Sequence, residues 1–179
     1  IIYTAPIKAL SNQKYRDFRD DYGQDAVGLM TGDIVINPDA QVLIMTTEVY
    51  RNMLLTNDPC IDHLSYVIFD EIHFISDMER GTVWEEAIIF SPEHVRFLAL
   101  SATIPNSAEF ADWIRSVKDH PVDVIKYDKR AVPLSHYFFD RDFGIIKREG
   151  ISQIKEAMSY PKYEKVIQKK RRSRKRRET

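Results

Sequence analysis

The sequence predicts an α/β fold, a parallel β-sheet with helices on both faces. Short apolar segments alternate along the chain with longer segments of helical periodicity, which is the pattern of repeated strand–helix units. The apolar segments are nearly continuous, as expected for strands that are covered on both faces. The 179 residues are enough for one domain with a substantial core and a smaller appendage.

The strands are predicted where apolar residues run together between turn-forming or polar residues. The six predicted strands are residues 1–6, 26–32, 42–47, 66–70, 97–103 and 122–127. The helices between them are predicted from apolar side chains that recur at a period of 3.6 residues. Three such helical faces are formed by Ile7, Tyr15, Phe18 and Tyr22, by Trp84, Ala87 and Ile88, and by Phe110, Trp113, Ile114 and Val117.

Two helix starts are also predicted. Asn106 has the side chain of an N-cap residue, and Glu109 stands three positions later, which is the spacing of a capping box. Thr47 is predicted to cap a helix that begins at Glu48. Glu85 and Glu86, in the helix that contains Trp84, are predicted to be surface residues or partners of Arg80.

Composition narrows the class of protein. Cys60 is the single cysteine, which excludes an internal disulfide framework and fits a reducing intracellular setting. No apolar run reaches the roughly 20 residues of a membrane helix, and the start of the chain lacks the pattern of a secretory signal. The chain opens on the strand-like IIYTAP without a methionine, so we expect it to be a piece of a longer protein.

The charge is distributed unevenly. Residues 1–161 carry 16 Lys+Arg and 25 Asp+Glu, a net charge of −9, whereas residues 162–179 carry 10 and 2, a net charge of +8. We therefore expect a globular domain over residues 1–140, a connector over 141–161 and a disordered basic tail over 162–179 that attracts nucleic acid. The tail also leaves a nuclear location open for a protein otherwise expected in the cytoplasm.

Small polar or acidic residues follow five of the predicted strands. In a parallel sheet the carboxyl ends of the strands meet at one edge, where functional residues gather. The sets are Thr4 and Pro6, Thr31-Gly32-Asp33, Thr46-Thr47-Glu48, Asp70-Glu71, and Ser101-Ala102-Thr103. Such an edge is suited to binding phosphates and a metal ion.

The stretch YVIFDEIHF, residues 66–74, ends an apolar strand in two carboxylates. This is the Walker B arrangement, in which Asp70 holds Mg²⁺ at the phosphates of a nucleotide and Glu71 orients and deprotonates the attacking water. The alternative is a strand that ends in acids at a solvent-exposed edge, with no catalytic role.

Five segments in this order carry a resemblance to a known family. They are TAPIKALSNQKYRDF, LMTGDIVINPDAQVLIMTTEVYRNML, VIFDEIHFISDMERGTVWEEAII, LALSATIPNSAEFADWI and KRAVPLSHY. Together they resemble the superfamily-two DExH-box RNA helicases of the superkiller and exosome-associated type, over roughly residues 1–140. The resemblance implies the first RecA-like domain of a P-loop NTPase, with ATP and Mg²⁺ as cofactors.

The resemblance also implies roles for individual residues. Asp70 would hold the metal ion through water, Glu71 would be the base, and His73 would couple the nucleotide state to Ser101 and Thr103, which link hydrolysis to strand separation. The residues that would lie along the nucleic-acid backbone are Pro6, Lys8, Thr31, Gly32, Asp33, Thr46, Thr47 and Glu48. The implied partner is RNA, single-stranded or with a single-stranded overhang, and an RNA-degrading complex; no membrane partner is implied.

Two parts of that family's machinery are absent from the 179 residues. No G-x-x-x-x-G-K-[ST] loop occurs, and no second RecA-like domain follows residue 150. We therefore expect a RecA-like domain that lacks its P-loop segment and is inactive by itself.

Other functions stay open at this point. A DNA-repair helicase of the same superfamily would use the same motifs. A non-catalytic RNA-binding module would use the strand-end residues and the tail without hydrolysis. A metallohydrolase would need Asp70, Glu71 and His73 as ligands, although consecutive residues of a strand point to opposite faces.

Overall fold

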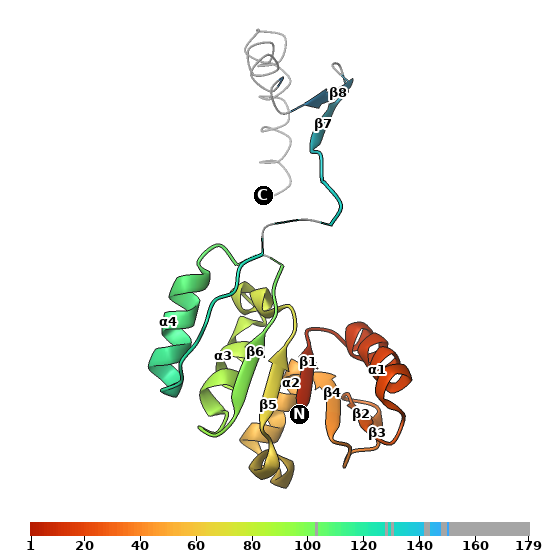
Figure 1. The fold of residues 1–179 in the computed structure, drawn as a ribbon, viewed down its shortest axis with the longest axis vertical. Coiled ribbons are helices and arrows are strands. Elements are labelled where there is room, and N and C mark those ends of the chain that lie inside the picture. Colours follow the sequence, from red (N-terminus) through yellow and green to blue (C-terminus); the bar gives the residue numbers. More distant parts are fainter. Residues whose placement is uncertain (103, 128, 130, 142–143, 148–149, 151–179) are drawn as a thin grey trace, which may run out of the picture. The chain divides into compact units, whose positions relative to one another are not determined.

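The computed structural model describes residues 1–102, 104–127, 129, 131–141, 144–147 and 150. The chain divides into two units at residue 125, and the first unit holds the six-stranded sheet (Figure 1). In the second unit, β7 (Tyr137–Asp140) and β8 (Gly144–Lys147) pair as an antiparallel hairpin. None of the helices that the structure describes has the length and apolar character needed to span a bilayer.

The sheet of the first unit has the strand order β3-β2-β4-β1-β5-β6. All neighbouring strands are parallel except β3, which runs antiparallel to β2. The strands are β1 (Ile2–Ala5), β2 (Val27–Met30), β3 (Val35–Ile36), β4 (Val42–Thr46), β5 (Tyr66–Phe69) and β6 (Arg96–Ala99). The expected parallel α/β sheet is confirmed, and the carboxyl ends of its five parallel strands lie along one edge.

Helices cover both faces of this sheet, as predicted. The α-helices are α1 (Lys8–Tyr22), α2 (Thr47–Leu55), α3 (Gly81–Phe90) and α4 (Ser107–Lys118), and two 3₁₀ helices, η1 (Pro59–His63) and η2 (Ile72–Ser76), flank β5. Tyr15 and Phe18 of α1 pack on one face of the sheet. Tyr50 of α2 and Trp84 of α3 are fully buried on the other face. Each face therefore has its own apolar core.

β5 shows how the pattern of apolar residues builds both cores. Val67 and Phe69 point to the α2–α3 face and are fully buried, whereas Ile68 points to the α1 face. Because all three side chains are apolar, the strand is held from both sides and ends where the apolar run stops, at Asp70. The position of Asp70 thus follows from burial of the residues before it.

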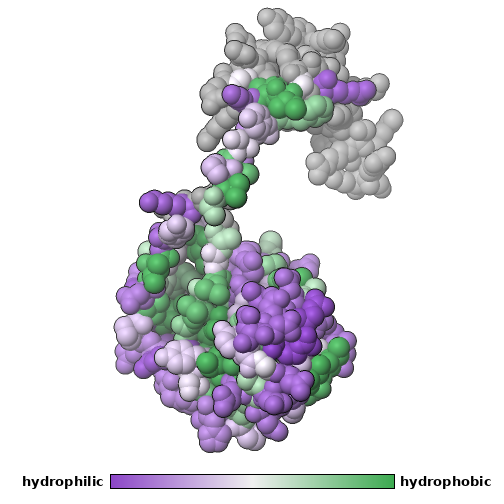
Figure 2. All heavy atoms as spheres, turned by 45° about the vertical axis from the view of Figure 1, so that its right-hand side comes forward, coloured by the Kyte–Doolittle hydropathy of each residue, from purple (hydrophilic) through white to green (hydrophobic). Residues whose placement is uncertain are grey.

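The α1 face of the sheet is covered only in part. Tyr66 of β5 and Leu98 of β6 lie on this face and keep about half of their surface exposed (51% and 49%). Figure 2 shows hydrophobic side chains gathered at the surface of this unit beside a strongly hydrophilic patch. Among the described residues no strand pairs with the outer edge of β6. The sheet therefore has room for further structure next to β5 and β6.

One predicted strand is absent from the described residues, and one short strand was missed. Residues 122–127 form no strand, since none of the described strands forms a hydrogen-bond ladder with them, and Ile125 is 93% exposed. The two-residue β3 was not predicted, because it is too short to show a pattern. Tyr22 lies on the same face of α1 as Phe18, with ring centroids 5.7 Å apart, but it is the last residue of the helix and is 66% exposed.

The helix start predicted at Asn106 is confirmed, the start predicted at Glu48 is wrong by one residue, and neither predicted capping bond to the backbone forms. Thr46, not Thr47, is the N-cap of α2, and its side chain makes no capping hydrogen bond. Asn106 is the N-cap of α4, but its Nδ2 donates to Glu109 Oε2 (3.1 Å), so the two side chains bond to each other and not to the backbone. α1 ends as helices often do, at Gly23 with φ 90°, whose N–H donates to Arg19 O.

Candidate functional site

Asp70 lies at the carboxyl end of β5, and both of its carboxylate oxygens have partners. Tyr3 of β1 donates its hydroxyl to Asp70 Oδ2 at 2.5 Å, and the backbone N–H of Glu71 donates to Oδ1 at 3.0 Å. The N–H of Asp70 itself donates to Thr4 O at 3.0 Å. The carboxylate is therefore oriented by β1 and by its own turn before any ligand arrives.

The same hydrogen bond affects Tyr3. Burial, and then the hydrogen bond and the negative charge of Asp70, raise the pKa of Tyr3 above its ordinary value of 10.0. The hydroxyl thus remains a donor to Asp70 throughout the physiological range. Sequence reasoning missed this residue, because a tyrosine within an apolar strand looks like an ordinary core residue.

Glu71 has an unusual backbone. Its φ and ψ are 52° and 44°, the left-handed region, which non-glycine residues rarely adopt. This conformation ends β5 abruptly and starts η2, so that Asp70 and Glu71 do not continue the alternation of the strand. The Glu71 side chain is 37% exposed, so water can reach its carboxylate.

His73 lies beside Glu71. Its Nδ1 is 3.2 Å from Glu71 Oε2 and 3.4 Å from Ser101 Oγ. Because Nδ1 carries at most one hydrogen, it can donate to Glu71 or accept from Ser101, and the proton on this nitrogen decides between the two contacts. Ser101 follows β6, the next strand of the sheet. The structure therefore brings Glu71, His73 and Ser101 together at neighbouring strand ends. Thr103 lies outside the described residues.

Lys8, Thr31 and Asp33 meet at the ends of β1 and β2. Lys8 Nζ is 2.8 Å from Asp33 Oδ1, and Thr31 Oγ1 donates to the same oxygen at 3.1 Å. The hydrogen bonds from Lys8 and Thr31 hold the pKa of Asp33 below its ordinary value. Gly32 lies between Thr31 and Asp33, and a Cβ there would be 3.9 Å from Lys8 Nζ, so the loop is close to the lysine without being crowded.

The start of α2 is joined to the residues after β1 by an arginine. Arg80 Nη2 donates to the Glu48 carboxylate and, at 2.6 Å, to Pro6 O. Of the two alternatives for Glu85 and Glu86, surface residues or partners of Arg80, the second is wrong. Glu86 instead pairs with Arg51 of α2 at 3.1 Å, and Glu85 stays on the surface of α3.

Thr46 and Thr47 differ in what they can bind. Both are buried, and Thr47 is completely so, with its Oγ1 free of any hydrogen-bond partner among the described residues. A ligand outside the protein could therefore meet the N-terminal N–H groups of α2 more readily than the Thr47 hydroxyl.

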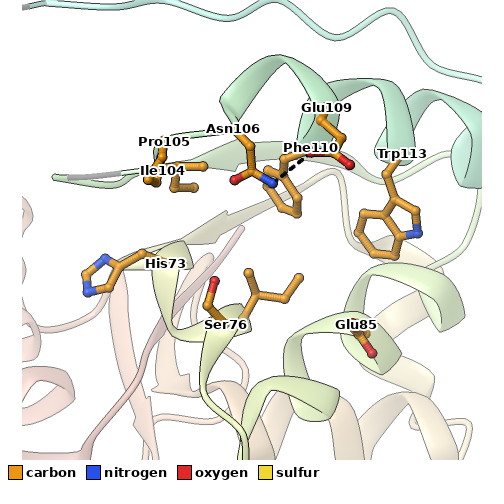
Figure 3. Close-up of a pocket in the computed structure, with 10 residues that line it drawn as sticks. His73, Ser76, Glu85, Ile104, Pro105, Asn106, Glu109, Phe110 and Trp113 are labelled. Atoms are coloured by element: carbon orange, nitrogen blue, oxygen red, sulfur yellow. Dashed lines mark hydrogen bonds between the residues drawn. The ribbon is translucent and has the colours of Figure 1, made fainter.

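A pocket of about 310 Å³ is lined by His73 and by residues of α4 (Figure 3). Phe110 and Trp113 of α4 form its apolar wall, with their rings stacked at 5.8 Å. Its polar groups include Glu85 and Glu109, and none of the described residues that line it is lysine or arginine. A phosphate chain would be repelled here, so this pocket does not extend the site at Asp70 and Glu71.

The partly exposed carboxylate of Asp70 has the chemistry of a Mg²⁺ ligand. A carboxylate next to open solvent offers the hard oxygen ligand that Mg²⁺ prefers, with water and phosphate oxygens as the other ligands. Among the described residues no three His, Cys, Asp or Glu side chains form a group that could hold a metal ion by themselves.

Comparison with known proteins places this geometry in context. Residues 1–110 match the sequence model of the DEAD/DEAH box helicases. The chain is 56% identical over 138 residues to the human Superkiller complex protein 2, a match that covers 77% of this chain and 11% of that protein. It is 53% identical over 139 residues to the ATP-dependent RNA helicase mtr4 of Schizosaccharomyces pombe, which covers 78% of this chain and 12% of that protein.

The fold has a counterpart among solved structures. A DEAD box protein from the hyperthermophile Methanococcus jannaschii superposes with a TM-score of 0.52 at 18% identity, over 65% of this chain and 34% of that chain. The chain spans about a tenth of the length of the curated relatives it matches.

Proposed function

Because the chain belongs to the DEAD/DEAH box helicase family, we propose that it supplies the first RecA-like domain of an ATP-dependent RNA helicase. In the complete protein, ATP hydrolysis would drive movement along RNA and strand separation, in RNA processing or decay. The observation that carries the proposal is the cluster of Asp70, Glu71, His73 and Ser101 at the ends of β5 and β6. The choice of RNA draws on the relatives, which are named as RNA helicases.

Each residue of the cluster has a chemical task in this proposal. The Glu71 carboxylate, open to water, takes the proton of the water that attacks the terminal phosphate. His73 Nδ1, 3.2 Å from Glu71, holds that carboxylate in place and reports its state to Ser101. Mg²⁺, when bound with ATP, offsets the negative charge of the phosphates, and Asp70 is the residue that would hold it through water.

The remaining parts of the site would come from elsewhere in the complete protein. A phosphate-binding loop and an arginine from a second domain are required for fast hydrolysis in this class of enzyme. The uncovered α1 face of β5 and β6, with Tyr66 and Leu98 half exposed, supports the idea that further structure packs beside the cluster.

RNA would lie along the edge formed by the ends of β1, β2 and β4. Lys8 is an exposed cation there, and the N-terminus of α2 offers backbone N–H groups to phosphate oxygens. Such contacts grip the backbone without reading bases, which suits a motor that moves along any sequence. The residues proposed for this contact are Pro6, Lys8, Thr31, Gly32, Asp33, Thr46, Thr47 and Glu48. For Thr47 the contact would be made by its backbone, because its side chain is buried.

Partners and place in the cell follow from the same proposal. A relative is named as a component of the superkiller complex, so we expect an RNA-degrading complex as a partner. An intracellular location is expected, with the cytoplasm preferred and the nucleus open.

The test uses the complete helicase with Glu71→Gln. The amide keeps the shape of the side chain but cannot act as a base, so RNA-stimulated ATP turnover should be abolished while nucleotide binding remains. Glu85→Gln, an exposed acid on α3, is the control and should leave turnover unchanged. If Glu71→Gln kept more than about a tenth of turnover, another residue would have to be the base.

Substrate choice is a separate measurement. Unwinding is compared on matched RNA and DNA duplexes with single-stranded overhangs. Preference for the DNA duplex would favour a DNA-repair helicase of the same family. Binding of RNA without unwinding by the complete protein would favour a non-catalytic module.

A further inference from the structure

Arg80 connects the loop after β1 with the start of α2, two segments that are distant in sequence. It is the N-cap residue of α3, and its Nη2 donates to Pro6 O at 2.6 Å in the loop after β1 and to the Glu48 carboxylate at the start of α2. Its guanidinium also lies over the ring of Trp84, 5.7 Å from the ring centroid. One side chain thus bonds to both of the segments that follow the paired strands β1 and β4, the loop after β1 and the first turn of α2.

The backbone of Arg80 is tied equally firmly to η2, the segment that carries His73. Asp77 Oδ1 accepts the N–H groups of Glu79 and Arg80, each at 2.9 Å, and Asp77 O accepts the N–H of Gly81 at 2.8 Å. A Cβ at Gly81 would lie 2.2 Å from Ile75 O, so only glycine lets α3 approach η2 this closely. A shift of η2 must therefore move the start of α3 and Arg80 with it.

We propose that Arg80 is a positioning residue that couples the nucleotide site to the nucleic-acid edge. This inference rests on the proposed function, since Pro6 and Glu48 are placed there among the residues at the RNA. When the nucleotide bound at Asp70, Glu71 and His73 is hydrolysed or released, η2 shifts and the Arg80 guanidinium shifts with it. Through its hydrogen bonds, Arg80 then moves the Pro6 carbonyl and Glu48. In the reverse direction, RNA held at this edge fixes η2 and favours hydrolysis.

The chemistry of arginine suits this task. The two hydrogens of one guanidinium nitrogen serve two acceptors, one in the loop after β1 and one in α2, while the planar group rests on Trp84. Arg80 and Glu48 keep only about a third of their side-chain surface exposed (37% and 33%), so solvent weakens their interaction less than that of a fully exposed pair. A lysine would keep the charge but lose the planar contact with Trp84.

The chain offers a matched control for a purely structural role. Arg51 of α2 pairs with Glu86 of α3 at 3.1 Å, so it too links α2 with α3 through an arginine–glutamate pair. In the part of the chain that the structure describes, no side-chain hydrogen bond or ion pair joins Arg51 or Glu86 to Pro6 or Glu48. Loss of the Arg51 pair should therefore affect stability without affecting the response to RNA.

The experiment compares Arg80→Gln, Arg80→Lys and Arg51→Gln in the complete helicase, with ATP turnover measured against RNA concentration. We expect Arg80→Gln to keep turnover without RNA within about two-fold of wild type, and to raise the RNA concentration for half-maximal stimulation on the order of ten-fold. Arg80→Lys should give an intermediate value. Arg51→Gln should lower the melting temperature and leave the RNA concentration unchanged.

A double-mutant cycle keeps the role of Arg80 testable even if the Arg80→Gln variant does not fold. If Arg80 acts through Glu48, the effects of Arg80→Lys and Glu48→Gln on the response to RNA will not add. Fully additive effects, a wild-type response to RNA in Arg80→Gln, or an equal loss in Arg51→Gln would overturn the role of Arg80. A wild-type protein whose turnover RNA does not stimulate would instead overturn the proposed function, and the role of Arg80 with it.

Discussion

Replacing Tyr3 by phenylalanine removes one atom from the site. The hydroxyl of Tyr3 donates to Asp70 Oδ2 at 2.5 Å, and the ring packs edge to face with Phe18 at 5.4 Å. Phenylalanine keeps the ring and its contact, so the change isolates the hydrogen bond. The Asp70 carboxylate then keeps only the N–H of Glu71 as a protein donor among the described residues.

The size of the effect follows from the charge on the acceptor. A hydrogen bond to an ionised group contributes about 1.5–3 kcal/mol, and water can reach Asp70 in part, so we expect about 1.5 kcal/mol of stability to be lost. This corresponds to a fall in melting temperature of roughly 3–6 °C. A carboxylate that has lost an orienting partner should also hold its metal ion about ten-fold less well.

The pH dependence has a definite sign. The pKa of Tyr3 is raised above 10.0 in the folded protein, so above pH 10 the unfolded chain loses its proton first. The stability that this hydroxyl contributes is therefore present below pH 10 and falls as the pH rises further. The difference in stability between wild type and Tyr3→Phe should narrow above pH 10.

Two assays test the reasoning. Thermal unfolding of the 179-residue chain gives the stability, and ATP turnover of the complete helicase against Mg²⁺ concentration gives the metal requirement. Tyr66→Phe is the control, because Tyr66 is half exposed on β5 and the tyrosine that donates to Asp70 is Tyr3. A melting temperature within about 1 °C of wild type and an unchanged Mg²⁺ requirement would refute the role given to this hydroxyl.

Three further outcomes are expected. Lys118 is 2% exposed and donates to Ile89 O at 2.8 Å and to Ser91 O, so Lys118→Met should cost about 2–3 kcal/mol in denaturant unfolding; a loss below about 0.5 kcal/mol would contradict this. The 179-residue chain alone should show no RNA-stimulated ATP turnover near about 1 s⁻¹, since the phosphate-binding loop and the second-domain arginine are absent from it. Removing the basic residues 169–177, which lie outside the described residues, should weaken the binding of single-stranded RNA. The slope of log affinity against log salt concentration, roughly −4 for the full chain, should become less steep. Equal affinities and equal slopes would show that Lys8 and its neighbours, and not the tail, bind the RNA.

The parallel sheet and the place of Asp70 were predictable from the sequence. Apolar strands buried on both faces show as continuous runs, and the run before Asp70 stops where the strand stops. Parallel strands share a direction, so their carboxyl ends lie at one edge of the sheet. The polar residues at these ends could therefore be placed at that edge without knowledge of the strand order. The His73 and Ser101 contact was expected from the family resemblance and lies at the ends of neighbouring strands.

The partners within the site were not predictable, because they depend on register. Tyr3 reaches Asp70 since β1 pairs with β5 with Tyr3 opposite Ile68, a pairing that no local pattern specifies. Pairing of Arg80 with Glu85 or Glu86 was one of two alternatives, but Arg80 reaches Glu48, 32 positions away in the sequence. Residues 122–127 have the composition of a strand, but a strand also needs a neighbour, which lies beyond the reach of local sequence.

The left-handed backbone of Glu71 sets a limit on how this protein can be stabilised. A residue other than glycine in that region costs of order 1–3 kcal/mol, and asparagine or glycine would relieve part of it. Stabilising substitutions chosen from backbone geometry alone would therefore favour Glu71→Gly or Glu71→Asn, at the position proposed for the base. In a directed-evolution experiment that selects for heat resistance without selecting for turnover, this position should be among the first to lose its carboxylate.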